Sequence, residues 1–218
     1  MINSTVKDIN IYGIEIKTLK KRKDGLKRQS EILLTALELF SKKGYYDTKL
    51  EDILKKAGIA RGTFYLHFNG KDDLLHTIVD THLEEMYRII SVLDISMDKP
   101  IEEISSLYIT IAQKLIHDER FKMFVRIMLK EAIGLDKALL QKLNNFYNKI
   151  ISMSAEYIAK AQQKGRLIDS IDPLFTSMCI IGSIKELVFQ WAVNDDSLDI
   201  EKGILTAVTV YFRGMVNS

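Results

Sequence analysis

The chain has 218 residues, of which 47% are hydrophobic and 28% are charged, with two prolines and one cysteine. This length allows one large or two small globular domains, and the scarcity of helix breakers favours an all-α fold. A single cysteine excludes a disulfide framework and a cysteine-based zinc site, and neither a signal peptide nor a membrane span is evident, so we expect a cytoplasmic protein without a metal or cofactor.

Positive charge is concentrated at the N-terminal end. Residues 1–71 carry 15 Lys and Arg against 8 Asp and Glu, whereas residues 72–218 carry 16 against 21. A basic first third joined to an acidic remainder indicates that the N-terminal part binds a polyanion. The alternative is two solvated surfaces that differ in charge by chance.

Residues 1–26 are predicted to form a basic N-terminal arm. Its first part shows no sustained helical pattern, and the sequence KTLKKRKDGLKR at 17–28 is a run of charge that would repel itself if packed. Two interpretations remain open. The run either follows the phosphates of a bound nucleic acid or is a solvated tail.

An amphipathic helix is predicted from Lys27. Gly44 is a suitable residue to end it. Apolar residues recur with helical spacing at Leu33, Ala36, Leu37 and Phe40.

Two short helices are predicted next. Thr48 and Glu51 have the spacing of a capping box for a helix over 49–57. Gly58 suits the left-handed position of a tight turn, and a second helix over 60–67 follows. The pair forms a helix-turn-helix whose second helix fits a DNA major groove about 12 Å wide. Many helical hairpins of this shape are only structural.

The remainder is predicted to be helical. Pro100, Gly134, Gly165 and the pair Asp172-Pro173 separate the segments, the last as an N-cap followed by proline at the first helical position. The helices are expected over 71–93, 100–117, 119–132, 136–164, 172–194 and 199–216.

The start of the second short helix carries the residues expected to read DNA bases. In a helix-turn-helix the N-terminal residues of the second helix face the base edges. Arg61 can donate two hydrogen bonds to guanine, and the Thr63 methyl group can meet a thymine methyl. Gly62 lets the backbone come close.

Three further side chains are expected at the phosphates. Tyr65, His67 and Lys71 can each donate a hydrogen bond to a phosphate oxygen. Phe64 and Phe68 are spaced to pack the motif instead. Taken singly, each of the polar residues also has an ordinary surface or packing role.

Residues 27–75 resemble the DNA-binding domain of the TetR/AcrR family of bacterial transcriptional regulators. Ala60 and Gly70 depart from the family pattern, because serine is common at both positions. The matching residues are the Ile32–Phe40 helix, Gly44-Tyr45, Thr48, Asp52-Ile53, Ala57-Gly58-Ile59, Gly62-Thr63-Phe64-Tyr65, His67-Phe68, Lys71 and Leu74-Leu75.

The resemblance implies a DNA-binding domain over 27–71 and a larger helical domain over 72–218 that binds a small effector. It also implies a homodimer that grips a palindromic operator, most often as a repressor. Carried over by position, the expected DNA-contacting residues are Thr48, Lys49, Arg61, Gly62, Thr63, Tyr65, His67 and Lys71.

The last two helices are expected to form the dimer interface. The 172–194 segment is apolar on most faces, and the 199–216 segment has one apolar stripe. A symmetric four-helix interface would explain both patterns, as would burial within one domain. The expected interface residues are Met178, Ile181, Leu205, Val208 and Phe212.

An effector cavity is predicted from composition alone. Its expected apolar lining is Tyr108, Phe124, Met128, Met153, Tyr157 and Trp191. One or two polar groups are expected to orient the ligand, from among His117, Arg126, Glu131, Glu186 and Gln190. Each of these residues can equally be plain core. The C-terminal sequence resembles a subgroup whose ligands vary, so the effector is expected to be lipophilic, such as a drug, a fatty acid or an acyl thioester.

Enzyme activity is not expected. None of the four histidines follows a glutamate by three residues, and no P-loop, GxGxxG or nucleophile elbow occurs. A helical adaptor that binds only proteins remains the alternative to a DNA-binding regulator.

Overall fold

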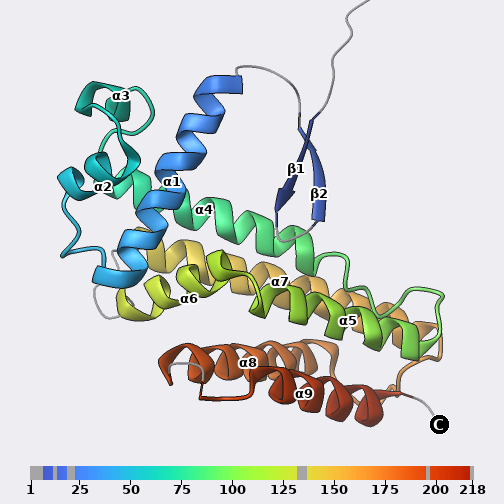
Figure 1. Ribbon diagram of the computed structural model, residues 1–218. Helices are drawn as coiled ribbons and strands as arrows, with labels where there is room; N and C mark the ends of the chain where they lie inside the picture. Colours follow the sequence, from blue (N-terminus) through green and yellow to red (C-terminus); the bar gives the residue numbers. More distant parts are fainter. Residues whose placement is uncertain (1–6, 12–13, 19–22, 132–136, 195–196, 217–218) are drawn as a thin grey trace, which may run out of the picture. The chain divides into compact units, whose positions relative to one another are not determined.

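A computed structural model describes residues 7–11, 14–18, 23–131, 137–194 and 197–216 of the chain. Helices dominate it, which confirms the expected all-α class (Figure 1). In chain order the elements are β1 (Lys7–Ile11), β2 (Ile14–Thr18), α1 (Lys23–Lys43), α2 (Leu50–Ala57), α3 (Arg61–Tyr65), α4 (Lys71–Ile90), α5 (Ile101–Ile116), α6 (Glu119–Glu131), α7 (Lys137–Gln163), α8 (Pro173–Val193) and α9 (Ile200–Met215).

The N-terminal arm contains structure that the sequence analysis did not predict. Strands β1 and β2 pair in an antiparallel hairpin in which Ile9 lies opposite Ile16. Helix α1 begins at Lys23, four residues before the expected start at Lys27. The hairpin has a sequence signal, because isoleucines alternate with other residues on both sides of the connection.

The contacts divide the chain into two compact units. Unit 1 comprises residues 1–82 and 118–134, and unit 2 comprises residues 83–117 and 135–218. The division does not follow chain order, because α6 packs against α1 in unit 1. Helix α4 contributes residues to both units.

The core of unit 1 fixes the orientation of the helix-turn-helix. Phe40 of α1, Ile53 of α2 and Phe64 of α3 are fully buried. The rings of Phe64 and Phe68 lie 5.6 Å apart between centroids. Because one face of the short helix α3 is anchored in this core, its other face points to solvent.

Unit 2 is built from the end of α4 and from α5, α7, α8 and α9. Helix α8 packs against both α7 and α9, and α9 also packs against α5. Asp172 caps α8 as expected, since its carboxylate accepts a hydrogen bond from the Phe175 amide at 2.9 Å and Pro173 is the first helical residue.

Within the described ranges, no helix is both long and apolar enough to cross a membrane.

Candidate DNA-binding site

The turn between α2 and α3 has the geometry that the sequence predicts. Gly58 adopts φ 63° and ψ 39°, in the left-handed region, which glycine adopts without the steric cost of a Cβ atom. The Ile59 amide then donates to the Leu54 carbonyl at 3.1 Å and closes the end of α2. Helix α3 follows at once, beginning at Arg61.

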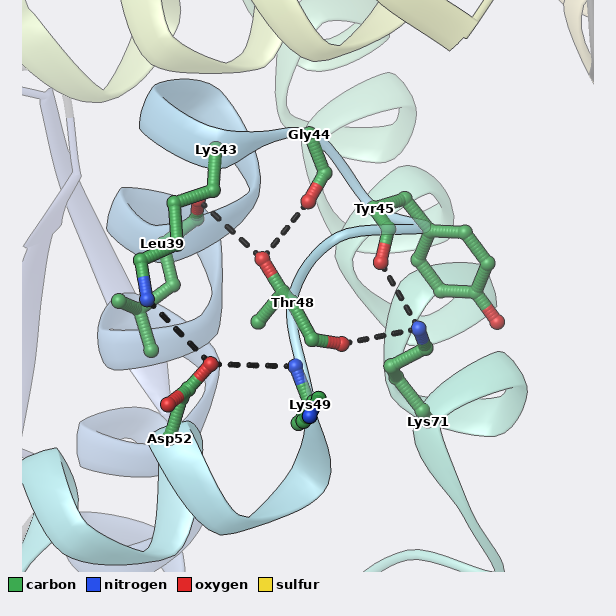
Figure 2. A network of polar contacts seen from close by, with 8 residues as sticks. All are labelled: Leu39, Lys43, Gly44, Tyr45, Thr48, Lys49, Asp52 and Lys71. Atoms are coloured by element: carbon green, nitrogen blue, oxygen red, sulfur yellow. Dashed lines mark hydrogen bonds and ion pairs between the residues drawn. The ribbon is translucent and has the colours of Figure 1, made fainter.

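The cap of α2 lies one residue later than predicted. Helix α2 begins at Leu50, and the carboxylate of Asp52 accepts hydrogen bonds from the Lys49 amide at 3.2 Å and from Lys43 Nζ at 3.3 Å (Figure 2). The expected capping box of Thr48 and Glu51 is therefore wrong. The hydrogen bond from the Lys49 amide, helped by the Lys43 ammonium, lowers the pKa of Asp52 below its usual value.

Thr48 is instead part of the support beneath the motif. Its side chain is fully buried, and its hydroxyl donates to the Gly44 carbonyl at 2.7 Å. This bond ties the loop before α2 to Gly44, the residue that follows α1, as Figure 2 shows. Thr48 thus lies beneath the exposed surface of the motif.

Lys71 belongs to the same network. Its Nζ donates to the carbonyls of Tyr45 at 2.8 Å and Thr48 at 2.9 Å, and it lies 4.2 Å from the centre of the Tyr45 ring (Figure 2). The Tyr45 hydroxyl donates to the Asp72 carboxylate. The first turn of α4 is thereby fastened to the loop between α1 and α2.

The other expected DNA-contacting residues lie at the surface. The Arg61 side chain is 58% exposed and Tyr65 is 50% exposed. Lys49 and Gly62 are also exposed, while Thr63 and His67 are half-buried. A Cβ atom built at Gly62 meets no other atom within 4 Å, so the backbone of α3 is open to a close approach.

One residue of this surface was missed by the sequence analysis. Glu51 of α2 accepts a hydrogen bond from Arg61 of α3 and forms an ion pair with it. The two residues are ten positions apart and on different helices, so no local pattern relates them. Only the fold of the turn brings their side chains together.

The structure separates the expected dimer residues into two sets. Met178 and Leu205 are 48% and 49% exposed, and Ile181 is half-buried. Val208 and Phe212 are buried in unit 2, where the Phe212 ring packs edge-to-face on Tyr108 at 5.4 Å. Both residues belong to the core of unit 2 instead of the exposed face, and Phe212 contacts Tyr108 of α5.

The expected effector residues are distributed between the two units. Phe124 and Met128 lie on α6 in unit 1, where Phe124 stacks on the His82 ring at 4.7 Å. In unit 2, Trp191 is buried in the core and the Tyr108 hydroxyl donates to the Leu93 carbonyl at 2.7 Å.

Met153 and Tyr157 do border a hollow, which lies in unit 2. Its volume is ≈ 670 Å³, and two of its lining residues are joined by a hydrogen bond of 3.1 Å from the Tyr157 hydroxyl to the Ser91 carbonyl. Its walls are Tyr87, Ser91, Asn148, Lys149, Ser152, Met153, Glu156, Tyr157 and Lys160.

Three of the expected polar groups pair with other side chains of unit 2. His117 pairs with Glu201 at 3.2 Å, and Gln190 donates to Glu186 at 2.7 Å. The side chain of Glu131 lies outside the described residues.

Comparison with known proteins supports the reading of the motif. The sequence model for bacterial regulatory proteins of the tetR family matches residues 32–78, from within α1 to the first half of α4. A fatty acid metabolism regulator protein of Bacillus subtilis (strain 168) is 24% identical over 173 residues, which are 78% of this chain and 86% of that protein.

Two solved structures share the fold. The complex of SmeT with triclosan has a TM-score of 0.76 at 21% identity and covers 88% of this chain and 93% of its own; SmeT is the repressor of the Stenotrophomonas maltophilia multidrug efflux pump SmeDEF. The fatty acid degradation regulator FadR from Bacillus halodurans has a TM-score of 0.69 at 21% identity and covers 89% of this chain and 98% of its own.

These relatives are named as regulators or repressors, in agreement with the expectation that the chain is not an enzyme. The matched segment contains the helix-turn-helix whose geometry is described above. Residues 32–78 of this chain are therefore similar to the tetR family of bacterial regulatory proteins, as the sequence analysis expects.

Proposed function

We propose that the protein is a repressor that binds a palindromic DNA operator as a homodimer and leaves it when a small lipophilic effector binds. The observation that carries this proposal is helix α3, anchored by the buried Phe64 and exposing Arg61 and Tyr65. A short helix held in this way is suited to enter a major groove without reorganisation.

The first turn of α3 contacts the base edges. Arg61 donates a bidentate pair to guanine O6 and N7, and Thr63 meets a thymine methyl. Gly62 allows the helix backbone to approach the bases, since nothing lies where its Cβ would be. Loss of Arg61 should therefore relax preference at one base position by about 1 to 3 kcal/mol.

Backbone contacts hold the motif on the duplex. Lys49, Tyr65 and His67 donate to phosphate oxygens on either side of the groove. Lys71 gives two of its three N–H donors to the carbonyls of Tyr45 and Thr48, so one donor remains for a phosphate. Thr48 acts by holding the loop beneath these contacts.

Dimerisation uses the exposed face of α8 and α9. Large apolar side chains line it, and water contact with so many of them is unfavourable for a lone chain. A palindromic operator presents its half-sites about 34 Å apart, one helical turn of DNA, and a two-fold four-helix contact of α8 and α9 would give the two chains the matching symmetry. The exposed apolar residues are Leu174, Phe175, Met178, Phe189, Val193, Leu205 and Val210.

The effector acts by shifting a population. Helix α4 begins at Lys71 in the support network and continues into unit 2. An effector that prefers one arrangement of unit 2 weakens DNA binding by its difference in affinity between the two arrangements. Its lipophilic class is supported by SmeT, which has been solved with triclosan, and by the relative that regulates fatty acid metabolism.

Selection of duplexes from a random pool by the purified full-length protein tests this function. The expected product is an inverted repeat that binds two chains, as measured by sedimentation of the complex. An enriched site without inverted symmetry and with one bound chain would contradict the dimeric mode. No enrichment at low salt would contradict DNA recognition itself and favour a protein-binding adaptor.

A further inference from the structure

The ion pair between Glu51 and Arg61 joins the two helices of the motif at the surface proposed to read DNA. Glu51 lies in the first turn of α2, and its Oε1 accepts a hydrogen bond from Nη2 of Arg61, the first residue of α3. Both side chains are exposed, at 63% and 58% respectively. The inference below rests on the proposed DNA-binding function.

Glu51 is available for this role because Asp52 caps α2. The Asp52 carboxylate accepts from the Lys49 amide, which is the bond that a capping residue makes. The carboxylate one position earlier in the chain points instead to the second helix, where it meets Arg61. Two adjacent acidic residues thus stabilise two different parts of the motif.

Arg61 needs an external support at its position. The N-terminus of a helix carries partial positive charge, which disfavours a cation there. The residue before it, Ala60, has no polar side chain to cap the helix. A carboxylate beside the guanidinium offsets this repulsion and restricts the rotamers of a long, exposed side chain.

The pairing leaves Arg61 able to read a base. A guanidinium has five N–H donors in a fixed plane, and the bond to Glu51 uses one of them. Two donors on one edge stay free for the O6 and N7 atoms of guanine. Glu51 therefore orients Arg61 without occupying the edge that recognises the base.

We infer that Glu51 is a specificity-determining residue that positions Arg61 for one base of each half-site. Its negative charge also opposes the phosphates, which penalises every duplex to the same extent. Replacing it by a neutral isostere should then have two opposite effects. Affinity for unrelated DNA rises, while preference for the base read by Arg61 falls.

The experiment compares Glu51→Gln with the wild type, both full length, on one duplex selected by the wild type and on its single-base variants. The matched control is Glu38→Gln, because Glu38 forms a comparable interhelical ion pair with Lys56 in the same unit. The expected result for Glu51→Gln is a loss of about two- to fivefold in preference at one position per half-site, the scale of an exposed ion pair. Glu38→Gln should leave the preference at every position unchanged.

A second arm repeats the substitution in an Arg61→Lys background. Lysine keeps the charge but lacks the planar fork, so Glu51→Gln should no longer change base preference there. Thermal unfolding of each variant checks that the fold is intact. Unchanged base preference in Glu51→Gln, or the same loss in the Arg61→Lys background, would overturn the inference while leaving DNA binding in place. If the wild type selects no duplex, the proposed function fails first and the inference fails with it.

Discussion

The Nζ atom of Lys71 donates a hydrogen bond to the backbone carbonyl of Thr48 at 2.9 Å, and a second to the carbonyl of Tyr45 at 2.8 Å. The first residue of α4 therefore holds the loop that positions α2. Substitution to methionine keeps the stem but removes both bonds and leaves two carbonyls without their charged donor. We expect Lys71→Met to lower the free energy of unfolding by about 1 to 3 kcal/mol.

Urea unfolding of the full-length protein measures this effect. Lys55→Met is the control, since Lys55 is an exposed lysine on the neighbouring helix α2. Equal stability of the two variants would show that the network around Lys71 contributes nothing beyond a surface charge.

Two glycines of the motif should respond in opposite ways to alanine. Gly58 has φ 63°, and a Cβ there has space but an unfavourable backbone conformation, so Gly58→Ala should cost about 1 kcal/mol of stability. Gly62 is helical, so Gly62→Ala should preserve or raise stability and instead weaken DNA binding by crowding the groove. Thermal unfolding and fluorescence anisotropy with a selected duplex separate the two effects. Loss of stability in Gly62→Ala with normal DNA affinity would contradict this division.

The exposed apolar face of α8 and α9 should hold the dimer together. Met178→Lys combined with Leu205→Lys places two charges per chain on this face, where their burial against a second copy would be strongly unfavourable. Sedimentation velocity is expected to show the wild type as a dimer and the double variant as a monomer. Leu140→Lys, at a leucine that is 44% exposed on α7, is expected to remain dimeric. A double variant that sediments like the wild type would place the interface elsewhere.

His82 should make unit 1 less stable in mild acid. Burial lowers the pKa of His82 because it disfavours the charged ring. The hydrogen bond to the Ile78 carbonyl raises the pKa, but by less than burial lowers it. Nδ1 lies 2.8 Å from that carbonyl, and a carbonyl only accepts, so Nδ1 carries the proton. The unfolded chain takes up a proton near pH 6.5 while the folded chain resists it. The contribution of His82 is therefore complete above pH 6.5 and is lost as the pH falls toward the lower, folded-state value.

The matching variant is His82→Phe, which keeps a ring against Phe124 and cannot titrate. Chemical unfolding between pH 7.5 and about pH 5 should show a smaller loss of stability in this variant than in the wild type. Parallel pH dependences for the two proteins would show that His82 takes up its proton equally in the folded and unfolded states.

Local signals explain which parts of the fold were predictable. Gly44, Gly58 and the pair Asp172-Pro173 end or start helices through their own backbone preferences, and each does so in the structure. The helix boundaries beyond Lys71 consequently lie within a few residues of those expected. The hairpin β1–β2 was missed even though its alternating isoleucines are a local signal.

The wrong predictions concern positions where the local sequence fits two arrangements equally well and tertiary contacts select one of them. Thr48 and Glu51 have suitable capping spacing, but the nearby Gly44 carbonyl takes the threonine hydroxyl and leaves the cap to Asp52. Leu205 and Val208 differ little in sequence context, yet only Val208 faces the core.

The candidate site divides in the same way. The residues of α3 were predicted from their place in the motif. Glu51 could not be predicted in this way, because its contact with Arg61 depends on how α2 and α3 are oriented in the fold. The expected effector residues were chosen by composition, which carries no information on location. The structure accordingly distributes them between two units.

Sequencing of bacterial genomic fragments retained by the purified full-length protein tests the central claim most directly. If two copies of α3 read duplex DNA, the retained fragments should share an inverted repeat, and the Arg61→Ala variant should lose preference at one position of each half. Fragments retained without any common sequence, in equal amounts by the wild type and by Arg61→Ala, would contradict the account.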